Sequence, residues 1–583
     1  MTLTIGKSVL ALSGEALPDR ELVGGKAWSI ARMRVLGLPV PPAFTITTAA
    51  CHAYLEAGQL SDELITEIEA GMDWLAEQTG RQFNATESPL LVSVRSGAPI
   101  SMPGMMDTVL NLGITTRTEQ ALADETGSAE FAKDTHRRFL ELFPTIVHKA
   151  TVEELDANAT SEQWHEQISA AIGKPLSIDP HKQLIEAVEA VFSSWNSRRA
   201  KRYRKHNGIA DSLGTAVTVQ AMVFGNLDEV SGTGVVFSRN PLTGDPAPYG
   251  EYLHRAQGED VVSGKFTPQP LATMQDSVAE AYQGLLNAVE VLEKENNDVQ
   301  DIEFTVQRGE LFLLQTRAAK RAPEASVRFA IDLVNEQLVD IDTSLTRVSA
   351  EQIRNLLTPR LKDKSQLAAA IASGEPACQG VGIGVVVSSS DEAERRAAAG
   401  EAVILARPTT SPEDVHGMIA AQAVVTEQGG STSHAAVVSR ALGTPCIVGC
   451  GDGALSHLLG QEVTVDGQHG QIFAGAAPIE LPNEAGNPYL SQLIAWLETR
   501  IPITVDYYEP TQHGDIYNLN NVEGAEEPAN LPHLLKGHKQ VAGSVLESDA
   551  AVVAALEAGV TTILVANRLP VMLAVWHHLR EAE

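Results

Sequence analysis

The sequence lacks the features of a membrane-spanning or secreted protein. Within its 583 residues, no apolar run approaches the roughly 18 residues that a membrane-crossing helix needs. The first residues contain no apolar segment of the kind found in signal peptides. Only four cysteines occur, too few for a disulfide framework in a chain of this length. These absences predict a cytoplasmic protein that folds around hydrophobic cores.

Positive charge is also scarce. The chain has 43 Lys and Arg against 74 Asp and Glu, a net charge of −31. A charge of this sign argues against general nucleic-acid binding and means that any site for an anionic substrate must be locally basic. One basic run, at 198–205, is expected to form a helix with charges all around its axis. We interpret it as a solvated helix rather than a nucleic-acid surface.

The cysteines offer no zinc site. Cys446 and Cys450 have CxxxC spacing, but no second pair completes a set of four ligands. Structural thiols are the better interpretation. The adjacent His577 and His578 are likewise interpreted as surface histidines, because neighbouring residues on a helix point in different directions.

Hydrophobic patterning predicts a multidomain protein of mixed α/β and α+β class. A charged, helical stretch that contains Pro359 reads as a connector, and a Pro- and Gly-containing stretch at 481–488 reads as a second linker. The expected units are a first domain at 1–345, a linker at 346–375, a second domain at 376–480, and a linker with a small α/β unit at 481–583.

Within these units, apolar periodicity predicts individual elements. The expected helices cover 61–79, 119–141, 181–206, 277–295, 548–558 and a last stretch from about 568. Strands are expected at 90–94, 216–224, 234–238, 381–387, 402–405, 423–426, 462–466, 503–508, 540–546 and 561–565. Residues 301–315 are expected to form a hairpin that turns at 307–310.

His434 is the most informative residue. It follows a Gly pair and the hydroxyl residues Thr432 and Ser433, and it precedes a small apolar stretch that suits a helix. The first turn of a helix offers free N–H groups and favours negative charge, and a neutral imidazole is a competent nucleophile for phosphorus. His434 therefore either carries a phosphoryl group or is a buried helix-start histidine without chemistry.

Four further groups suggest phosphate binding in the first domain. Lys26 follows a Gly pair, and Arg95 lies among small residues, which suits a guanidinium that contacts phosphate. Asp301 and Glu303 are two positions apart, so on a strand their side chains share one face. Two carboxylates placed in this way could hold Mg²⁺. The hairpin would bring Gln315 across from Glu303, with Arg317 on the same face. The alternative for Lys26 is an ordinary surface lysine. The alternative for the pair Asp301 and Glu303 is a strand face exposed to solvent.

The stretch 429–449 resembles the phosphohistidine signature of the pyruvate phosphate dikinase and phosphoenolpyruvate synthase family. The resemblance implies that His434 shuttles phosphate between two distant sites. Ser431 stands where family members usually carry Met, a departure that we interpret as tolerated. Thr432 matches a position that some plant members phosphorylate, and we interpret it here as a hydroxyl at a helix start. Arg407 matches a family position that could meet the phosphoryl group, although Pro408 departs from the usual residue.

Further segments resemble pyruvate phosphate dikinase in the same order: 22–27, 37–44, 90–113, 214–224, 231–244, 249–252, 256–264 and 301–321. The resemblance implies an ATP-grasp nucleotide-binding domain followed by a swivelling phosphohistidine domain. Lys26 and Arg95 would contact ATP phosphates, and Asp301 and Glu303 would hold Mg²⁺. Gln315 and Arg317 would orient phosphates, while Gln220, Met222 and Val223 would border the adenine.

Segment 93–113, and residues 250–252 followed by 256–262, resemble the branch of the family that uses inorganic phosphate rather than water. The implied reaction converts ATP and phosphate to AMP, pyrophosphate and phosphorylated His434 within a mobile domain. Complete members end in a pyruvate-binding (β/α)₈ barrel, which needs roughly 200 residues or more. The stretch after 488 is too short for one, so we expect no unaided formation of phosphoenolpyruvate. The acceptor stays open: pyruvate on a separate subunit, another small molecule, or a protein. A catalytically vestigial ATP-binding regulator is the alternative.

Overall fold

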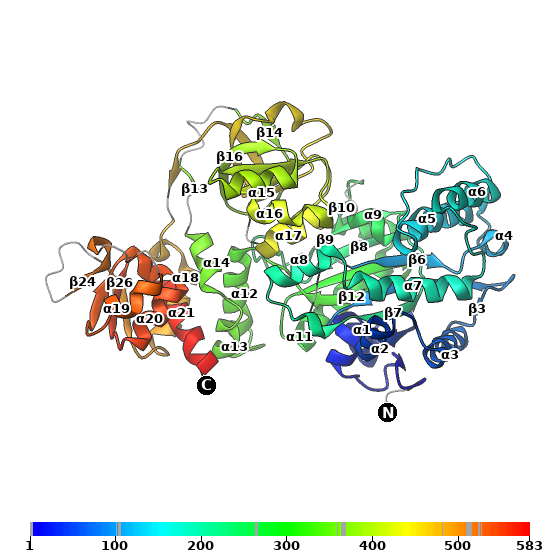
Figure 1. Ribbon diagram of the computed structural model, residues 1–583, viewed down its shortest axis with the longest axis horizontal. Coiled ribbons are helices and arrows are strands. Elements are labelled where there is room, and N and C mark those ends of the chain that lie inside the picture. The colour runs from blue at the N-terminus through cyan, green and yellow to red at the C-terminus, as the bar shows by residue number, and fades with distance from the viewer. Residues whose placement is uncertain are drawn as a thin grey trace.

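The structure, a computed structural model, describes residues 4–100, 102, 106–262, 266–357, 360–362, 369–442, 444–480, 482–508, 516–522, 525 and 528–582. Pro359 and parts of the segments discussed above (101, 103–105, 263–264, 363–368, 443 and 481) lie outside the described residues. Figure 1 shows three units: a large N-terminal one, a second one that carries α17 (His434–Leu442), and a C-terminal one at the opposite end from the first.

The first unit contains two five-stranded antiparallel sheets. The first sheet has the order β1 (Val9–Ala11), β2 (Ala43–Ile46), β7 (Ala216–Ala221), β5 (Val92–Gly97), β6 (Thr108–Leu112). The second has the order β10 (Gln269–Pro270), β9 (Tyr249–His254), β8 (Gly232–Phe237), β11 (Gln300–Gln307), β12 (Glu310–Ala318). A short pair, β3 (Gln82–Phe83) and β4 (Pro89–Leu90), lies outside both.

Eleven helices belong to this unit within the described residues. They are α1 (Arg20–Val35), α2 (Thr48–Ala57), α3 (Asp62–Thr79), α4 (Thr116–Thr126), α5 (Ala129–Val147), α6 (Ser161–Ile172), α7 (Pro180–Ser194), α8 (Arg198–His206), α9 (Gly258–Val262), α10 (Met274–Ser277) and α11 (Ala279–Asn296).

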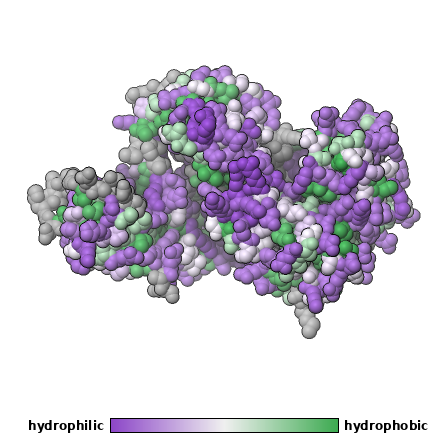
Figure 2. All heavy atoms as spheres, in the orientation of Figure 1, coloured by the Kyte–Doolittle hydropathy of each residue, from purple (hydrophilic) through white to green (hydrophobic). Residues whose placement is uncertain are grey.

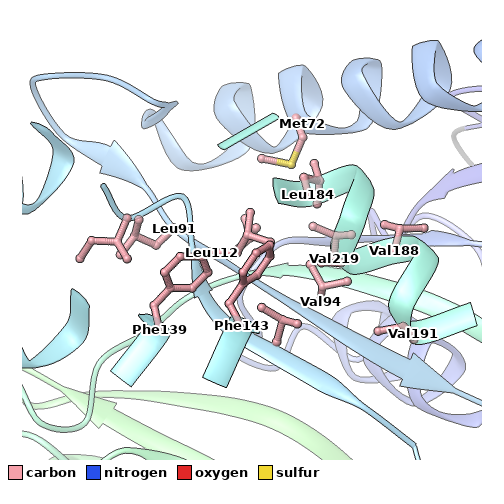
Figure 3. Close-up of a cluster of buried hydrophobic side chains, with 14 of the residues drawn as sticks. Met72, Leu91, Val94, Leu112, Phe139, Phe143, Leu184, Val188, Val191 and Val219 are labelled. Atoms are coloured by element: carbon pink, nitrogen blue, oxygen red, sulfur yellow. The ribbon is translucent and has the colours of Figure 1, made fainter. Parts of the chain in front are cut away.

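The largest core of this unit lies between the first sheet and the helices α3, α5 and α7 (Figure 3). Met72 of α3, Phe139 and Phe143 of α5 and Val188 of α7 are all at most 2% exposed, as is Val219 of β7. Burying each such side chain contributes about 1.5–3 kcal/mol. This packing fixes β5 and β7, the strands that carry Arg95 and Gln220.

Local signals explain where the helices begin and end. The expected helix at 61–79 is confirmed as α3, which Ser61 caps and Gly80 ends in a left-handed conformation with φ of 66°. The expected helix at 119–141 is wrong as one element, because Gly127 ends α4 and Ser128 caps α5. The one expected at 181–206 is likewise two helices, since Ser197 caps α8.

The basic run is not wholly solvated. Arg204 of α8 is only 1% exposed, stacks 4.0 Å from the ring of Trp195 and donates from Nε to Asp211 over 2.7 Å. Several other basic residues of α8 are exposed, as expected. On the face of the molecule that Figure 2 shows, hydrophilic residues are spread widely, with apolar ones scattered among them.

The second unit is built on an eight-stranded mixed sheet. Its order is β14 (Ala372–Ser373), β21 (Gln471–Ala474), β20 (Glu462–Asp466), β16 (Val381–Val387), β17 (Val403–Arg407), β18 (Ala423–Thr426), β19 (Cys446–Val448), β15 (Glu375–Cys378). The four strands from β16 to β19 are parallel, and α15 (Ser390–Ala398), α16 (Val415–Ala420) and α17 accompany them. The chain enters and leaves through β13 (Arg360–Leu361) and β22 (Ile479–Glu480), which pair with each other.

The C-terminal unit has a four-stranded parallel sheet. Its order is β23 (Thr504–Tyr507), β26 (Thr562–Val565), β25 (Gln540–Ala542), β24 (Tyr517–Asn518), and its helices are α18 (Pro488–Glu498), α19 (Leu531–Leu534), α20 (Asp549–Glu557) and α21 (Arg568–Ala582).

Three helices that precede β13 share the core of the C-terminal unit. They are α12 (Pro323–Asn335), α13 (Ile341–Leu345) and α14 (Ala350–Leu356). Leu345 and Ile353 pack in one cluster with Leu493 and Trp576, and His577 Nε2 lies 3.1 Å from the carbonyl oxygen of Leu345. Part of the stretch expected as a connector is therefore a packed helix.

All four cysteines are free thiols. Burial raises the pKa of Cys51 and of Cys446 to about 11, and that of Cys378 and of Cys450 to about 12. Protonated, mostly buried thiols agree with the structural role expected for them. Among the described helices, none is both long and apolar enough to cross a membrane.

Candidate functional site

His434 is the first residue of α17 and lies partly buried. Its Nδ1 is 3.1 Å from Thr410 Oγ1, and its Nε2 has no hydrogen-bond partner within the described part of the chain. Burial lowers the pKa of His434 to about 4, although Asp414 acts in the opposite direction. The imidazole is therefore neutral at physiological pH. If Nδ1 donates to Thr410, the lone pair of Nε2 is left for reaction.

A large cavity lies between the first and second units. We call it the central cavity; its volume is about 920 Å³. It brings together most of the site residues expected from sequence. Those that line it are Lys26, Arg95, Gln220, Met222, Val223, Glu303, Gln315, Arg317, Thr432 and His434. Asp301 and Arg407 are not among its lining residues.

A close backbone approach places Lys26. Helix α1 is interrupted at Gly24, which has φ of 76°, and a Cβ there would lie 1.8 Å from the carbonyl oxygen of Gly97 at the end of β5. The next residue, Gly25, donates its N–H to Ala98 over 3.0 Å. Only glycine permits this contact. Burial lowers the pKa of Lys26, and Arg95 lowers it further.

The two carboxylates lie on one strand of a hairpin, as predicted. In the antiparallel pair of β11 and β12, Asp301 is opposite Arg317 and Glu303 is opposite Gln315. Arg317 Nε donates to Asp301 over 2.8 Å, and Arg95 donates to Glu303 over 3.1 Å. The side chain of Asp301 is 2% exposed. These contacts and this burial contradict the alternative of a solvated strand face.

Their environments shift the two carboxylates in opposite directions. Burial raises the pKa of Asp301, even though Arg317 opposes it. Burial would also raise the pKa of Glu303, but Arg95, Arg317 and Lys26 bring it below its ordinary value. Asp301 Oδ1 is buried with no hydrogen-bond partner among the described residues. This donor set, two carboxylates with one oxygen left over, fits Mg²⁺.

The residues expected to border the adenine lie near the end of β7: Gln220 is within the strand, and Met222 and Val223 follow it. Gln220 is 2% exposed and donates from Nε2 to Pro41 over 3.2 Å. The backbone N–H of Met222 donates to Leu91 over 2.9 Å. These bonds hold the strand end in place, and Gln220, Met222 and Val223 are among the residues that line the cavity.

Glu251 of β9 joins the two units, although sequence reasoning gave it no role. Its Oε2 accepts from Thr432 Oγ1 over 2.6 Å, and its Oε1 accepts from the N–H of Ser431 over 3.1 Å and from its hydroxyl over 2.8 Å. All three residues are buried. A possible sequence signal was Ser431, which supplies a hydroxyl where the family usually carries Met.

Arg407 lies at the end of β17, away from the cavity wall. It donates to the carbonyl oxygen of Ser388 over 2.9 Å and forms an ion pair with Asp414 at 3.2 Å. Thr410, three residues later, is the residue that contacts His434. Both lie in the segment 405–414, and nothing in the residue types singled out Thr410.

Comparison with known families covers both halves of this site. Residues 20–81 and 62–283 match the family described as pyruvate phosphate dikinase, AMP/ATP-binding domain. Residues 399–470 match the PEP-utilising enzyme, mobile domain. The order of these two matches, an AMP/ATP-binding domain model followed by a PEP-utilising mobile domain model, defines the class of this chain as that of the PEP-utilising enzymes. Within that class, the chain belongs to the pyruvate phosphate dikinase family, which confirms the resemblance inferred from sequence.

Several curated relatives are similar over most of this chain. It is 40% identical over 534 residues to pyruvate, phosphate dikinase of Rhizobium meliloti, covering 84% of this chain and 59% of that protein. The Clostridium symbiosum protein of the same name is 40% identical over 516 residues, covering 82% and 59%. The chloroplastic one of Flaveria trinervia is 45% identical over 457 residues, covering 74% and 48%. The chain spans about half the length of these relatives.

Proposed function

We propose that the protein is a phosphotransferase that phosphorylates His434 from ATP and inorganic phosphate, releasing AMP and pyrophosphate. One observation carries the proposal. The unpartnered Nε2 of His434 belongs to a residue that lines the same cavity as Lys26, Arg95 and Arg317. A neutral nucleophile and a cluster of cations are the two groups that phosphoryl transfer to histidine needs.

ATP would lie in the central cavity between these groups. Met222 and Val223, at the end of β7, would border the adenine, and Lys26, Arg95 and Arg317 would contact the phosphates. Gln315 would orient them. This assignment makes the first unit, with proposed bounds 1–345, an ATP-grasp domain. The cations would neutralise charge on the transferring phosphoryl group, the largest contribution in reactions of this kind.

Mg²⁺ would be held by Asp301 and Glu303. Bound there, the ion would supply further charge neutralisation to the phosphates. Arg317 and Arg95 pair with these carboxylates in the structure. The same guanidinium groups are the ones assigned to phosphate contact, so binding of ATP with Mg²⁺ would exchange partners within one buried cluster.

The second unit would carry the phosphoryl group away. We propose a swivelling domain at 376–480, between linkers at 346–375 and 481–488. Its departure would break the bonds of Ser431 and Thr432 to Glu251. The acceptor that it would visit is open, and pyruvate on a separate chain is one candidate. The role of the C-terminal unit at 489–583 is open as well.

The test uses ATP labelled at the β-phosphate, with Mg²⁺ and with or without inorganic phosphate. We expect acid-labile label on the protein, and AMP and pyrophosphate only when phosphate is present. His434→Ala should abolish the label. His457→Ala, which changes an exposed histidine of the same unit, is the matched control and should keep it. Binding of ATP without AMP or phosphoenzyme would contradict the proposal and favour a nucleotide-sensing protein.

A further inference from the structure

A second cavity, of about 320 Å³, lies where the first unit, α14 and α17 meet. We call it the arginine cavity, because Arg321, Arg347 and Arg440 all line it. Ser349, Gln352 and Asn355 add polar groups to its wall, and Glu351 is its one acidic lining residue. A volume of this size accommodates a small ligand.

The positive charge around this cavity exceeds the negative charge that pairs with it. Arg321 binds Asp298 through two hydrogen bonds of 2.8 and 2.9 Å. Arg347 lies 3.5 Å from the same carboxylate and donates to the carbonyl oxygen of Asn297 over 2.6 Å. One carboxylate therefore serves two guanidinium groups.

Arg440 of α17 is the third cation and has neutral partners. Its two terminal nitrogens donate to the carbonyl oxygens of Ala377 and Ser431 over 3.1 and 2.8 Å. It is 3% exposed, and its Nε has no hydrogen-bond partner in the described part of the chain. Arg440 also lies 5.7 Å from the centroid of the Phe237 ring, and burial lowers its pKa although Asp301 opposes this. Its hydrogen bonds reach no carboxylate, and a buried cation of this kind is costly unless an anion completes its surroundings.

We propose that the arginine cavity binds a small phosphate-type anion, such as inorganic phosphate or pyrophosphate. Three arginine residues line this cavity, and planar guanidinium groups suit the oxygens of a phosphate group. The site is distinct from the one proposed for ATP, because Glu351, Gln352 and Asn355 line only the arginine cavity. Arg347 lines both cavities, so it is unsuitable as a test of either.

The bound anion joins two units. Arg321 and Arg347 belong to the first unit and to the turn before α14, whereas Arg440 belongs to the second unit. Arg440 also holds the backbone of Ser431, the residue that contacts Glu251. An anion that binds only when these groups are together stabilises that arrangement by mass action. It thereby keeps His434 at the central cavity.

The test is calorimetric titration of the full chain with pyrophosphate, and separately with inorganic phosphate, without nucleotide. Two nearly isosteric variants of α14 change the charge of this cavity in opposite directions. Asn355→Asp should weaken binding about tenfold, because a carboxylate then faces the anion. Glu351→Gln should tighten it. Salt of about 0.15 M limits effects of these charges on the central cavity, since the Debye length is then about 8 Å.

Lys26→Met is the control, because Lys26 lines only the central cavity. It should leave binding at the arginine cavity unchanged, and it should weaken only binding of the anion in the central cavity. If Lys26→Met abolishes binding and both α14 variants leave it intact, the anion lies in the central cavity and the proposal is overturned. Absence of binding in the unsubstituted chain would overturn it too. If one of the two anions binds and the other does not, the site is assigned to that anion.

A second measurement tests the link between the units. Pyrophosphate should slow backbone hydrogen exchange of the loop 430–433 in the unsubstituted chain, and much less in Asn355→Asp. Unchanged exchange at saturating pyrophosphate would contradict the bridging role. His434→Ala should retain the calorimetric response. Absence of phosphoenzyme from the unsubstituted chain, with pyrophosphate binding retained, would contradict the proposed function alone.

Discussion

Replacing Glu251 by glutamine should weaken the association of the first and second units. Glu251 accepts three hydrogen bonds from Ser431 and Thr432, and a glutamine of the same size cannot accept them as a charged group. A hydrogen bond to a charged group contributes about 1.5–3 kcal/mol, against about 0.5–1.5 kcal/mol for a neutral one. Each bond then loses about 1–1.5 kcal/mol, so over three bonds the loss should be about 3–4.5 kcal/mol, or roughly 150- to 2,000-fold in the equilibrium between associated and separated units.

Hydrogen exchange of the loop 430–433 measures this equilibrium directly. In Glu251→Gln, exchange of these amides should accelerate, and label transfer from ATP to His434 should slow to a similar extent. The matched control is Glu229→Gln, which changes an exposed glutamate that pairs with Arg255. The reasoning would be refuted by loop exchange and His434 phosphorylation that both stay within twofold of the unsubstituted chain.

Three further outcomes are expected. Gly24→Ala should unfold at a markedly lower temperature and bind ATP poorly, because its Cβ would meet Gly97. The control, Gly37→Ala, lies at φ of 72° with open space around it and should lower the free energy of unfolding by only about 1–2 kcal/mol. Equal losses of stability in the two variants, measured by calorimetry, would contradict this. Because the pKa of His434 is lowered to about 4, its imidazole stays neutral from pH 7 down to about 5, so its protonation should not slow label transfer there; a rate that falls with an apparent pKa near 6.5 would disagree. Ile353→Ala should destabilise the C-terminal unit by about 2–5 kcal/mol, seen as a lower denaturant midpoint, and an unchanged midpoint would show that α14 is not part of that core.

Short-range patterns predicted the carboxylate pair well. Alternation along a strand and a Gly-containing turn were enough to predict Gln315 opposite Glu303, with Arg317 on the same face. The structure adds that Arg317 lies opposite Asp301. These contacts lie within one hairpin, but they also depend on a shift of register between Glu303 and Phe304, which strand alternation alone does not predict. The position of His434 at the start of a helix was similarly local, since the Gly pair and the apolar stretch both lie within the same short segment.

Contacts between the units were beyond sequence reasoning. Glu251 and Thr432 are 181 positions apart, and no periodicity relates them. The sequence pointed to Arg407, but Thr410 is the residue that contacts His434, because of the way the chain turns after β17. The amphipathic helices α12 to α14 presented an apolar face, but the sequence could not say that the C-terminal unit would cover it. Contacts of this kind depend on how helices and strands from different units pack against one another.

The pairing of β13 with β22 has a consequence for folding order. These strands bring positions 361 and 479 side by side, and the helices that flank them, α14 and α18, pack in one core. Closing an unstructured loop of this length carries an entropic penalty that grows with the logarithm of its length. If the inserted unit folds first, its own strands bring its ends together, and the search for the partners of Ile353 becomes nearly local. The second unit should then fold before the C-terminal unit and the helices α12 to α14 that complete its core.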